Sequence, residues 1–252
     1  EIKYEPCKNK VVDETWLRNW LNTLWKEALP LDHTRSFPAR AYLSKRRVLK
    51  AGLSASDIRF HPALEYRTKA KKSLGHHPAI LCLIRNNLGQ PVGIHRTYIT
   101  TFGVKAMLGG ENKAKKMTQS VLKATKGRVV RTFAPQNGVI GISEGMETAL
   151  SVYQAKQFPV WPGISDTNVR NFVPPEGVHT VINFVDKDRN KAGENSAETL
   201  LENLSLKGIQ VINLYPPTPI LESDPKGVDW NDQLIRDPSG FDILDSVLAE
   251  LN

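Results

Sequence analysis

The chain has 252 residues, of which 40% are hydrophobic and 24% charged, and its net charge is +8. This composition fits one large or two modest globular domains, and no apolar run approaches the roughly 18 residues of a membrane-spanning helix. Two distant cysteines, Cys7 and Cys82, exclude a disulfide framework and an intact zinc ribbon, and no secretory signal is present. We therefore expect a cytoplasmic protein with no zinc in this fragment and no membrane partner. Because the first residue is Glu1 and not Met, we expect a fragment or a processed form.

The charge is divided unevenly along the chain. Residues 1–136 contain 26 Lys and Arg and 9 Asp and Glu, a net charge of +17, whereas residues 137–252 contain 8 and 17, a net charge of −9. A basic half of this kind indicates a polyanionic partner. The carboxylates of the acidic half would repel the same polyanion unless cations intervene, so they require a separate explanation.

The first predicted elements are helices. Residues 13–29 read as a helix capped by Asp13, residues 36–48 as a second helix, and Ser54–Asp57 as the capping box of a short third helix. The first helix carries an apolar stripe that we expect to be core or a docking face, with base stacking as the alternative. The stripe consists of Trp16, Leu17, Trp20, Leu21, Leu24 and Trp25.

The middle of the chain predicts a β-hairpin. Residues 79–85 and 91–101 are strand-like, and the turn sequence 86-NNLGQ-90 separates them. Alternation along the second strand places Arg96 on one face and His95 on the other. A basic and poorly periodic stretch, residues 105–131, follows the hairpin.

From residue 138 onward, apolar strands alternate with helices. This rhythm indicates a parallel sheet covered by helices on both faces, and in such sheets ligands bind beyond the carboxyl ends of the strands. The sequence 134-APQNG-138 marks the start of this part. The predicted strands are residues 139–143, 159–161, 180–185 and 209–214, and the predicted helices are residues 146–156, 167–172 and 195–206.

Three acidic motifs follow strands of this sheet. They are Glu144-Gly145, Asp186-Lys187-Asp188 and the pair Asp229 and Asp232 in 229-DWND-232. Oxygen ligands gathered at one rim suit Mg²⁺, which prefers a few carboxylates together with water and phosphate. Two such ions can bind the attacking and leaving oxygens of a phosphoryl transfer. Each motif alone is weak, but their order and strand-end placement together are specific.

These motifs resemble the Toprim domain, the catalytic fold of bacterial-type primases, type IA and II topoisomerases and some nucleases. The phrase 144-EGMETALS-151 looks most like the EGxxTA form of plasmid- and phage-encoded primases. Replicative primases usually carry another acid four residues after the Glu, where this chain has Thr148, and Glu147 lies one residue earlier. Lys187 also replaces the small residue often found between the two aspartates.

The resemblance extends upstream of the acidic motifs. The segment 84-IRNNLGQPVGIHRTY-98 is similar to the primase hairpin that leads to a Gly-x-x-Arg-like strand, and residues 113–131 take the place of the basic ridge that holds template and nucleotides. By that resemblance, the partners are a single-stranded DNA template, nucleoside triphosphates and a replicative helicase. The residues implied in nucleic-acid or nucleotide binding are Arg96, Lys105, Lys115, Lys116, Lys123 and Arg128.

We therefore predict an α/β protein with a Toprim domain at residues 137–237, preceded by a basic mixed α+β subdomain at residues 35–136. A helical segment at residues 1–34 and a helix at residues 238–252 complete it. The predicted function is a primase catalytic core for DNA replication, which makes short RNA primers with Mg²⁺ or Mn²⁺ in a two-metal site. A Toprim nuclease and a catalytically degenerate single-stranded DNA-binding module are the alternatives. The predicted catalytic residues are Glu144, Asp186 and Asp188, and the predicted metal ligands are these three together with Asp229 and Asp232.

Overall fold

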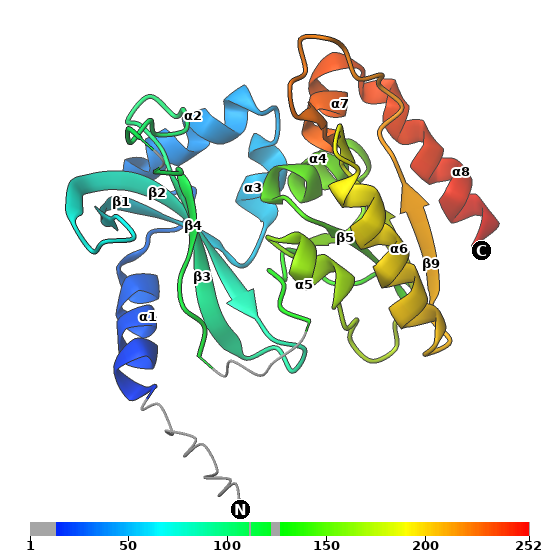
Figure 1. Cartoon of the computed structure of the whole chain (residues 1–252), viewed down its shortest axis with the longest axis horizontal. Helices are drawn as coiled ribbons and strands as arrows, with labels where there is room; N and C mark the ends of the chain where they lie inside the picture. Colours follow the sequence, from blue (N-terminus) through cyan, green and yellow to red (C-terminus); the bar gives the residue numbers. More distant parts are fainter. Residues whose placement is uncertain (1–13, 111, 122–126, 252) are drawn as a thin grey trace, which may run out of the picture.

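The computed structural model describes residues 14–110, 112–121 and 127–251. Within them, two four-stranded sheets lie side by side, one antiparallel in the order β1-β2-β3-β4 and one parallel in the order β6-β5-β7-β9 (Figure 1). The antiparallel sheet and its helices come first in the chain. The structure therefore confirms the predicted α/β fold, in which a helix-covered parallel sheet follows a mixed α+β part.

The basic half of the chain builds helices and the antiparallel sheet. The predicted hairpin is confirmed, because β2 and β3 pair antiparallel with Cys82 opposite His95. In chain order the elements are α1 (Thr15–Glu27), η1 (Thr34–Ser36), α2 (Phe37–Lys45), α3 (Leu49–Ser54), β1 (Ile58–Arg67), β2 (Ser73–Arg85), β3 (Pro91–Tyr98) and β4 (Lys115–Met117).

The first helix forms as predicted, but only part of its apolar stripe is buried. Leu17, Leu21 and Leu24 are buried, whereas Trp16 and Trp20 are 61% and 40% exposed. The two tryptophans lie on the flanks of a helix that packs through one narrow face, so they are not core residues, and a docking face stays the prediction for them. The predicted cap, at position 13, lies outside the described residues.

The predicted third helix is wrong in position. Helix α3 ends at Ser54 and β1 begins at Ile58, so residues 54–57 close one element and do not open a helix. The carboxylate of Asp57 accepts two hydrogen bonds from Arg85 in β2, at 2.6 and 2.8 Å, and caps no helix. The strand β1 was not predicted, because its formation depends on pairing with β2 and not on a local pattern.

The acidic half forms the parallel sheet and the helices around it. Ile140 and Ile142 of β5 pack with residues of α5 and α6, whereas Ile182 and Phe184 of β7 pack with residues of α4 and α7. Both faces of the sheet are therefore covered, as predicted. The elements are β5 (Val139–Ser143), α4 (Met146–Lys156), β6 (Val160–Pro162), α5 (Asp166–Arg170), β7 (Thr180–Phe184), β8 (Lys187–Asp188), α6 (Ala192–Ser205), β9 (Gln210–Leu214), β10 (Gly227–Val228), α7 (Trp230–Arg236), η2 (Pro238–Phe241) and α8 (Asp242–Glu250).

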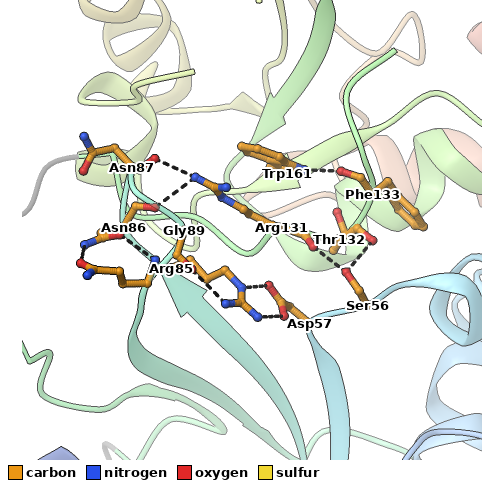
Figure 2. Close-up of polar contacts among 11 residues, drawn as sticks. Ser56, Asp57, Arg85, Asn86, Asn87, Gly89, Arg131, Thr132, Phe133 and Trp161 are labelled. Carbon is orange, nitrogen blue, oxygen red and sulfur yellow. Dashed lines mark hydrogen bonds and ion pairs between the residues drawn. The ribbon is translucent and has the colours of Figure 1, made fainter. Parts of the chain in front are cut away.

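Residues 129–133 connect the two sheets and are held on the antiparallel side by β2 and its turn (Figure 2). Val129 exchanges two backbone hydrogen bonds with Arg85, of 2.8 and 3.0 Å. The side chain of Arg131 donates to the carbonyl oxygens of Asn86 and Asn87, at 3.3 and 2.8 Å. One arginine therefore fixes the hairpin turn to the connecting segment.

The same segment is held on the parallel side by β6. The guanidinium of Arg131 lies over the ring of Trp161, 5.0 Å from its centroid, and the indole nitrogen of Trp161 donates to the carbonyl oxygen of Phe133 at 2.6 Å (Figure 2). The hydroxyl of Thr132 donates to the carbonyl oxygen of Val160, also at 2.6 Å. These contacts form a seam between the two sheets. Among the described residues, no helix is long and apolar enough to cross a membrane.

Candidate active site

Adjacent parallel strands bring two of the predicted acids to one edge of the sheet. Ser143 at the end of β5 pairs with Phe184 at the end of β7, so Glu144 and Asp186 follow at the same carboxyl edge. A cavity of about 160 Å³ opens there between the two halves of the chain. Its lining is Arg46, His95, Lys105, Lys115, Glu144, Gly145, Met146, Glu147, Thr148, Ile164, Asp186 and Asp229.

Burial, together with nearby carboxylates, raises the pKa of three acids that line the cavity, Glu144, Asp186 and Asp229. Burial raises the pKa of Asp186 well above its usual range, and the charges of Asp229 and Glu144 raise it further. A hydrogen bond of 3.3 Å from the hydroxyl of Thr148 opposes that rise. Burial also raises the pKa of Glu144 and of Asp229. An edge with this much unbalanced negative charge favours a bound cation.

The two aspartates of the 186–188 motif have different surroundings. Of the described residues, Asp188 lies outside the lining of the 160 Å³ cavity, but its charge contributes to the raised pKa of Asp186 and of Glu144. Burial raises the pKa of Asp188 itself, and a hydrogen bond from the backbone of Gly193 opposes the rise. The ammonium of Lys187 donates to the carbonyl oxygen of Thr218 at 3.3 Å, away from the carboxylates. Lys187 therefore does not occupy the place of a cation between them.

The 229-DWND-232 motif has a structural role as well as a place in the site. Asp229 is the N-cap of α7, and its carboxylate accepts a hydrogen bond from the backbone N–H of Asp232 at 2.8 Å. In turn, the carboxylate of Asp232 accepts a hydrogen bond from the backbone N–H of Asp229 at 3.1 Å. Trp230 between them is fully buried in the core. Asp229 lines the cavity, whereas Asp232 lies outside its described lining.

The opposite wall of the cavity is basic. Lys105 and Lys115, both predicted from the sequence, line it, and both ammonium groups pair with the buried carboxylate of Glu147. Sequence reasoning assigned neither Arg46 nor His95 to the site, yet both line the cavity. No local signal distinguishes Arg46 from the other basic residues of the first half, because only the packing of α2 against the second half brings it there.

A second and larger cavity continues from Lys115 toward the first sheet. It measures about 770 Å³ and lies between the β1–β2 turn and the approach to β4. Lys69, Lys113, Lys115 and Lys116 line it, and the ammonium of Lys116 lies 4.6 Å from the ring centroid of Tyr66. Lys115 is thus common to the described linings of the two cavities.

The remaining predicted basic residues lie elsewhere in the structure. The guanidinium of Arg96 donates to the carbonyl oxygen of Met117 at 3.3 Å, and that of Arg128 to the hydroxyl of Ser120 at 2.9 Å. Both arginines are bound within the first half of the chain, and they are not part of the described lining of either cavity. Lys123 lies outside the described residues.

The carboxylates of the cavity fit a hard cation that also binds water and phosphate oxygens. Among the described residues, no three His, Cys, Asp or Glu side chains gather closely enough to hold a metal ion by themselves. Mg²⁺ does not require such a cage, since it is commonly held by one or two carboxylates, several waters and the phosphates of a substrate. Glu144, Asp186 and Asp229 provide only carboxylate oxygens, so the site suits Mg²⁺ or Mn²⁺ in this mode.

Comparison with known proteins divides the chain into two matched parts. Residues 15–131 match a domain of unknown function (DUF7146), and residues 139–239 match the Toprim domain. The second half of this chain is a Toprim domain. The match contains all three acidic motifs from which the Toprim resemblance was predicted, and confirms that resemblance. No curated protein sequence matches the chain.

The Toprim domain and the part before it together have the fold of primase catalytic cores. The chain is similar to the DnaG primase catalytic domain bound to ssDNA, with 14% identity, a TM-score of 0.57, and coverage of 94% of this chain and 79% of that one. It is also similar to a DNA primase domain from Pseudomonas aeruginosa (14% identity, TM-score 0.53, coverage 88% and 75%). The RNA polymerase domain of Mycobacterium tuberculosis primase DnaG is a third such structure (18% identity, TM-score 0.51, coverage 87% and 78%).

Proposed function

We propose that this chain is the catalytic core of a DNA primase, which joins nucleoside triphosphates into short RNA primers on single-stranded DNA. The observation that carries the proposal is the 160 Å³ cavity, in which Lys105 and Lys115 face Glu144, Asp186 and Asp229. A triphosphate needs both walls, since lysines attract its phosphates and carboxylates hold the cations that neutralise them. The shared fold with primase cores supports the same reading.

The carboxylates have separate roles in this reaction. The 3′-hydroxyl of the primer attacks the α-phosphorus, a P–O bond forms, the bond to the β-phosphate oxygen breaks, and pyrophosphate leaves. Glu144 accepts the proton of the hydroxyl, and its pKa, raised by burial and by Asp166 and Asp188, makes it a stronger base than an exposed glutamate. Asp186, Asp188 and Asp229 would hold Mg²⁺ or Mn²⁺, which would neutralise the phosphate charge. Asp232 has only a structural role in this proposal, as part of the capping box of α7.

The 770 Å³ cavity is the proposed path of the template strand. Its lysines would bind backbone phosphates without sequence specificity, and the aromatic ring of Tyr66 forms part of its wall. Because Lys115 lines both cavities, the larger one is the nearer of the described surfaces to which a strand beside the proposed nucleotide site could bind.

Primer synthesis is tested with single-stranded template, labelled nucleoside triphosphates, and Mg²⁺ or Mn²⁺. We expect template-dependent RNA oligomers from the wild-type chain and a loss of roughly 10²-fold or more from Asp186→Asn, because the variant would hold the cation that neutralises the transition state less tightly. Asp242→Asn is the matched control, since Asp242 lies on the exposed surface of α8 and pairs with Lys156.

Two other outcomes would replace the proposal. Scission of the template without growth of a product would identify a nuclease, and retention of DNA with neither reaction would identify a binding module. Equal primer synthesis by wild type and Asp186→Asn would reject the site and leave the activity to other residues.

A further inference from the structure

Glu147 is a buried carboxylate with three partners from other parts of the chain. It lies on α4, three residues after Glu144, and is 4% exposed. The hydroxyl of Tyr42 donates to its Oε1 at 2.6 Å, and the ammonium of Lys115 donates to its Oε2 at 2.9 Å. The ammonium of Lys105 lies 3.6 Å from Oε1. Both oxygens of Glu147 are thus occupied by donors, so this acid of the EGxxT motif is not available as a metal ligand.

The cluster contains charged groups that alter one another's pKa. Burial alone would raise the pKa of Glu147, but the charges of Lys115 and Lys105 outweigh it and lower that pKa well below its usual range. Burial would lower the pKa of Lys115, but Glu147 reverses the effect and leaves that pKa raised. Burial lowers the pKa of Lys105, and the charge of Glu147 opposes that effect. Two lysine side chains therefore share one carboxylate beside the cavity.

The contacts of Glu147 restrict the two flexible lysine side chains before any ligand binds. Lysine carries its charge on four rotatable carbons and loses side-chain entropy when it is fixed on a ligand. Lys105 comes from the loop after β3 and Lys115 from β4, yet one carboxylate on α4 brings both ammonium groups to the cavity that Glu144 and Asp186 line.

We propose that Glu147 is a positioning residue, which holds Lys105 and Lys115 in place to receive the phosphates of a nucleoside triphosphate. This inference rests on the proposed function of the cavity. Bound phosphates take the remaining hydrogen bonds of the two ammonium groups, while Tyr42 keeps the carboxylate in place.

Lys115 is the group whose charge depends most on Glu147, so the test must account for every neighbour that faces it. Burial and the charge of Lys115 lower the pKa of His95 to about 4, so this imidazole is neutral across the assay range. Burial raises the pKa of the Cys82 thiol and of the Tyr42 phenol, so both stay neutral as well. The charged neighbours that remain are Glu147, Lys105, Arg46, Glu144 and Asp229.

The decisive variant is Glu147→Gln, which keeps the shape and one acceptor oxygen but removes the charge. We expect the KM for nucleoside triphosphate to rise about tenfold, with a smaller change in kcat, because ground-state phosphate binding is lost. We also expect the alkaline limb of the kcat/KM profile to move to lower pH, since Lys115 without its anion loses its proton more easily. In Glu147→Gln/Lys115→Arg we expect a smaller shift of that limb, because arginine stays protonated and only Lys105, whose pKa burial lowers, still titrates there. Glu202→Gln, on the exposed face of α6, is the matched control.

Two further measurements keep the inference open to refutation. Should Glu147→Gln fail to fold by circular dichroism, Tyr42→Phe loosens the carboxylate but keeps its charge, and we expect a raised KM with no shift of the alkaline limb. Should the wild-type chain make no primers, the dissociation constant of a fluorescent ATP analogue with Mn²⁺ tests the positioning alone, with weaker binding expected for Glu147→Gln. Wild-type KM and pH profile in Glu147→Gln, unchanged KM in Tyr42→Phe, or no binding of the analogue by the wild-type chain would each overturn the inference. A loss of kcat with unchanged KM would also overturn it, because phosphate binding would then not depend on Glu147.

Discussion

Replacing Arg131 by Met tests whether the seam between the two sheets depends on one side chain. Methionine keeps most of the stem but removes the guanidinium, and with it the hydrogen bonds to Asn86 and Asn87 and the stacking on Trp161 (Figure 2). The two half-exposed hydrogen bonds contribute about 1–2 kcal/mol together, and the cation–π contact about 0.5–1 kcal/mol. Burial and repulsion from Arg85 lower the pKa of Arg131 and offset part of this gain.

We therefore expect Arg131→Met to lower the free energy of unfolding by about 2 kcal/mol, which corresponds to a Tm decrease of roughly 4–8 °C in a domain of this size. The measurement is thermal unfolding followed by circular dichroism and by tryptophan fluorescence, because Trp161 reports directly on the seam. Arg35→Met is the control, since the side chain of Arg35 is exposed and no described residue pairs with it. A loss within about 0.5 kcal/mol of the control, the usual scatter of surface substitutions, would refute the assigned role of Arg131.

Three other perturbations test the acidic edge and its support. Because the pKa of Asp186 is raised by burial and then by Asp229 and Glu144, the cation-free chain loses stability as the pH rises through that pKa. Without divalent cations, Asp186→Asn should therefore have a higher Tm than the wild type at pH 8 and the same Tm at pH 4. Mg²⁺ should raise the Tm of the wild type alone. Equal Tm values at pH 8 would contradict this reasoning. Gly227→Ala places a Cβ 1.9 Å from the carbonyl oxygen of Lys187 at a φ of +119°. It should therefore destabilise the chain far more than Gly208→Ala, which has open space at a φ of +72° and costs about 1 kcal/mol. Similar urea midpoints for the two variants would argue against the β8–β10 contact. Lys187→Met should leave primer synthesis within twofold of wild type, since its ammonium bonds to the Thr218 carbonyl, and a strong loss would place that ammonium in the site.

The sequence by itself predicted the fold of the second half and the position of its acids. Apolar strands that alternate with helices have few packing solutions, and the parallel sheet with helices on both faces is the common one. Once the sheet is parallel, residues that follow its strands meet at one edge, which is why Glu144 and Asp186 could be placed together without coordinates. The hairpin of β2 and β3 followed in the same way from alternation and a turn sequence.

Strand β1 and the burial of α1 were beyond local reasoning. A strand forms where another strand offers hydrogen-bonding partners, and the pairing of β1 with β2 is not contained in the pattern of residues 58–67. The helical stripe identified the buried leucines of α1, but the width of the packed face decided that Trp16 and Trp20 remain exposed.

The tertiary structure alone decided what each charged residue pairs with. Glu147 lies 32 positions from Lys115 and 105 positions from Tyr42, so no spacing rule connects them. Lys187 sits between two aspartates in sequence, yet its side chain turns to Thr218 because β8 pairs with β10 there. Local sequence determines the periodicity of strands and helices, since that depends on neighbouring residues. The partner of a buried charge depends on which distant segments the packed core brings within about 3 Å, and that is settled only when the whole chain folds.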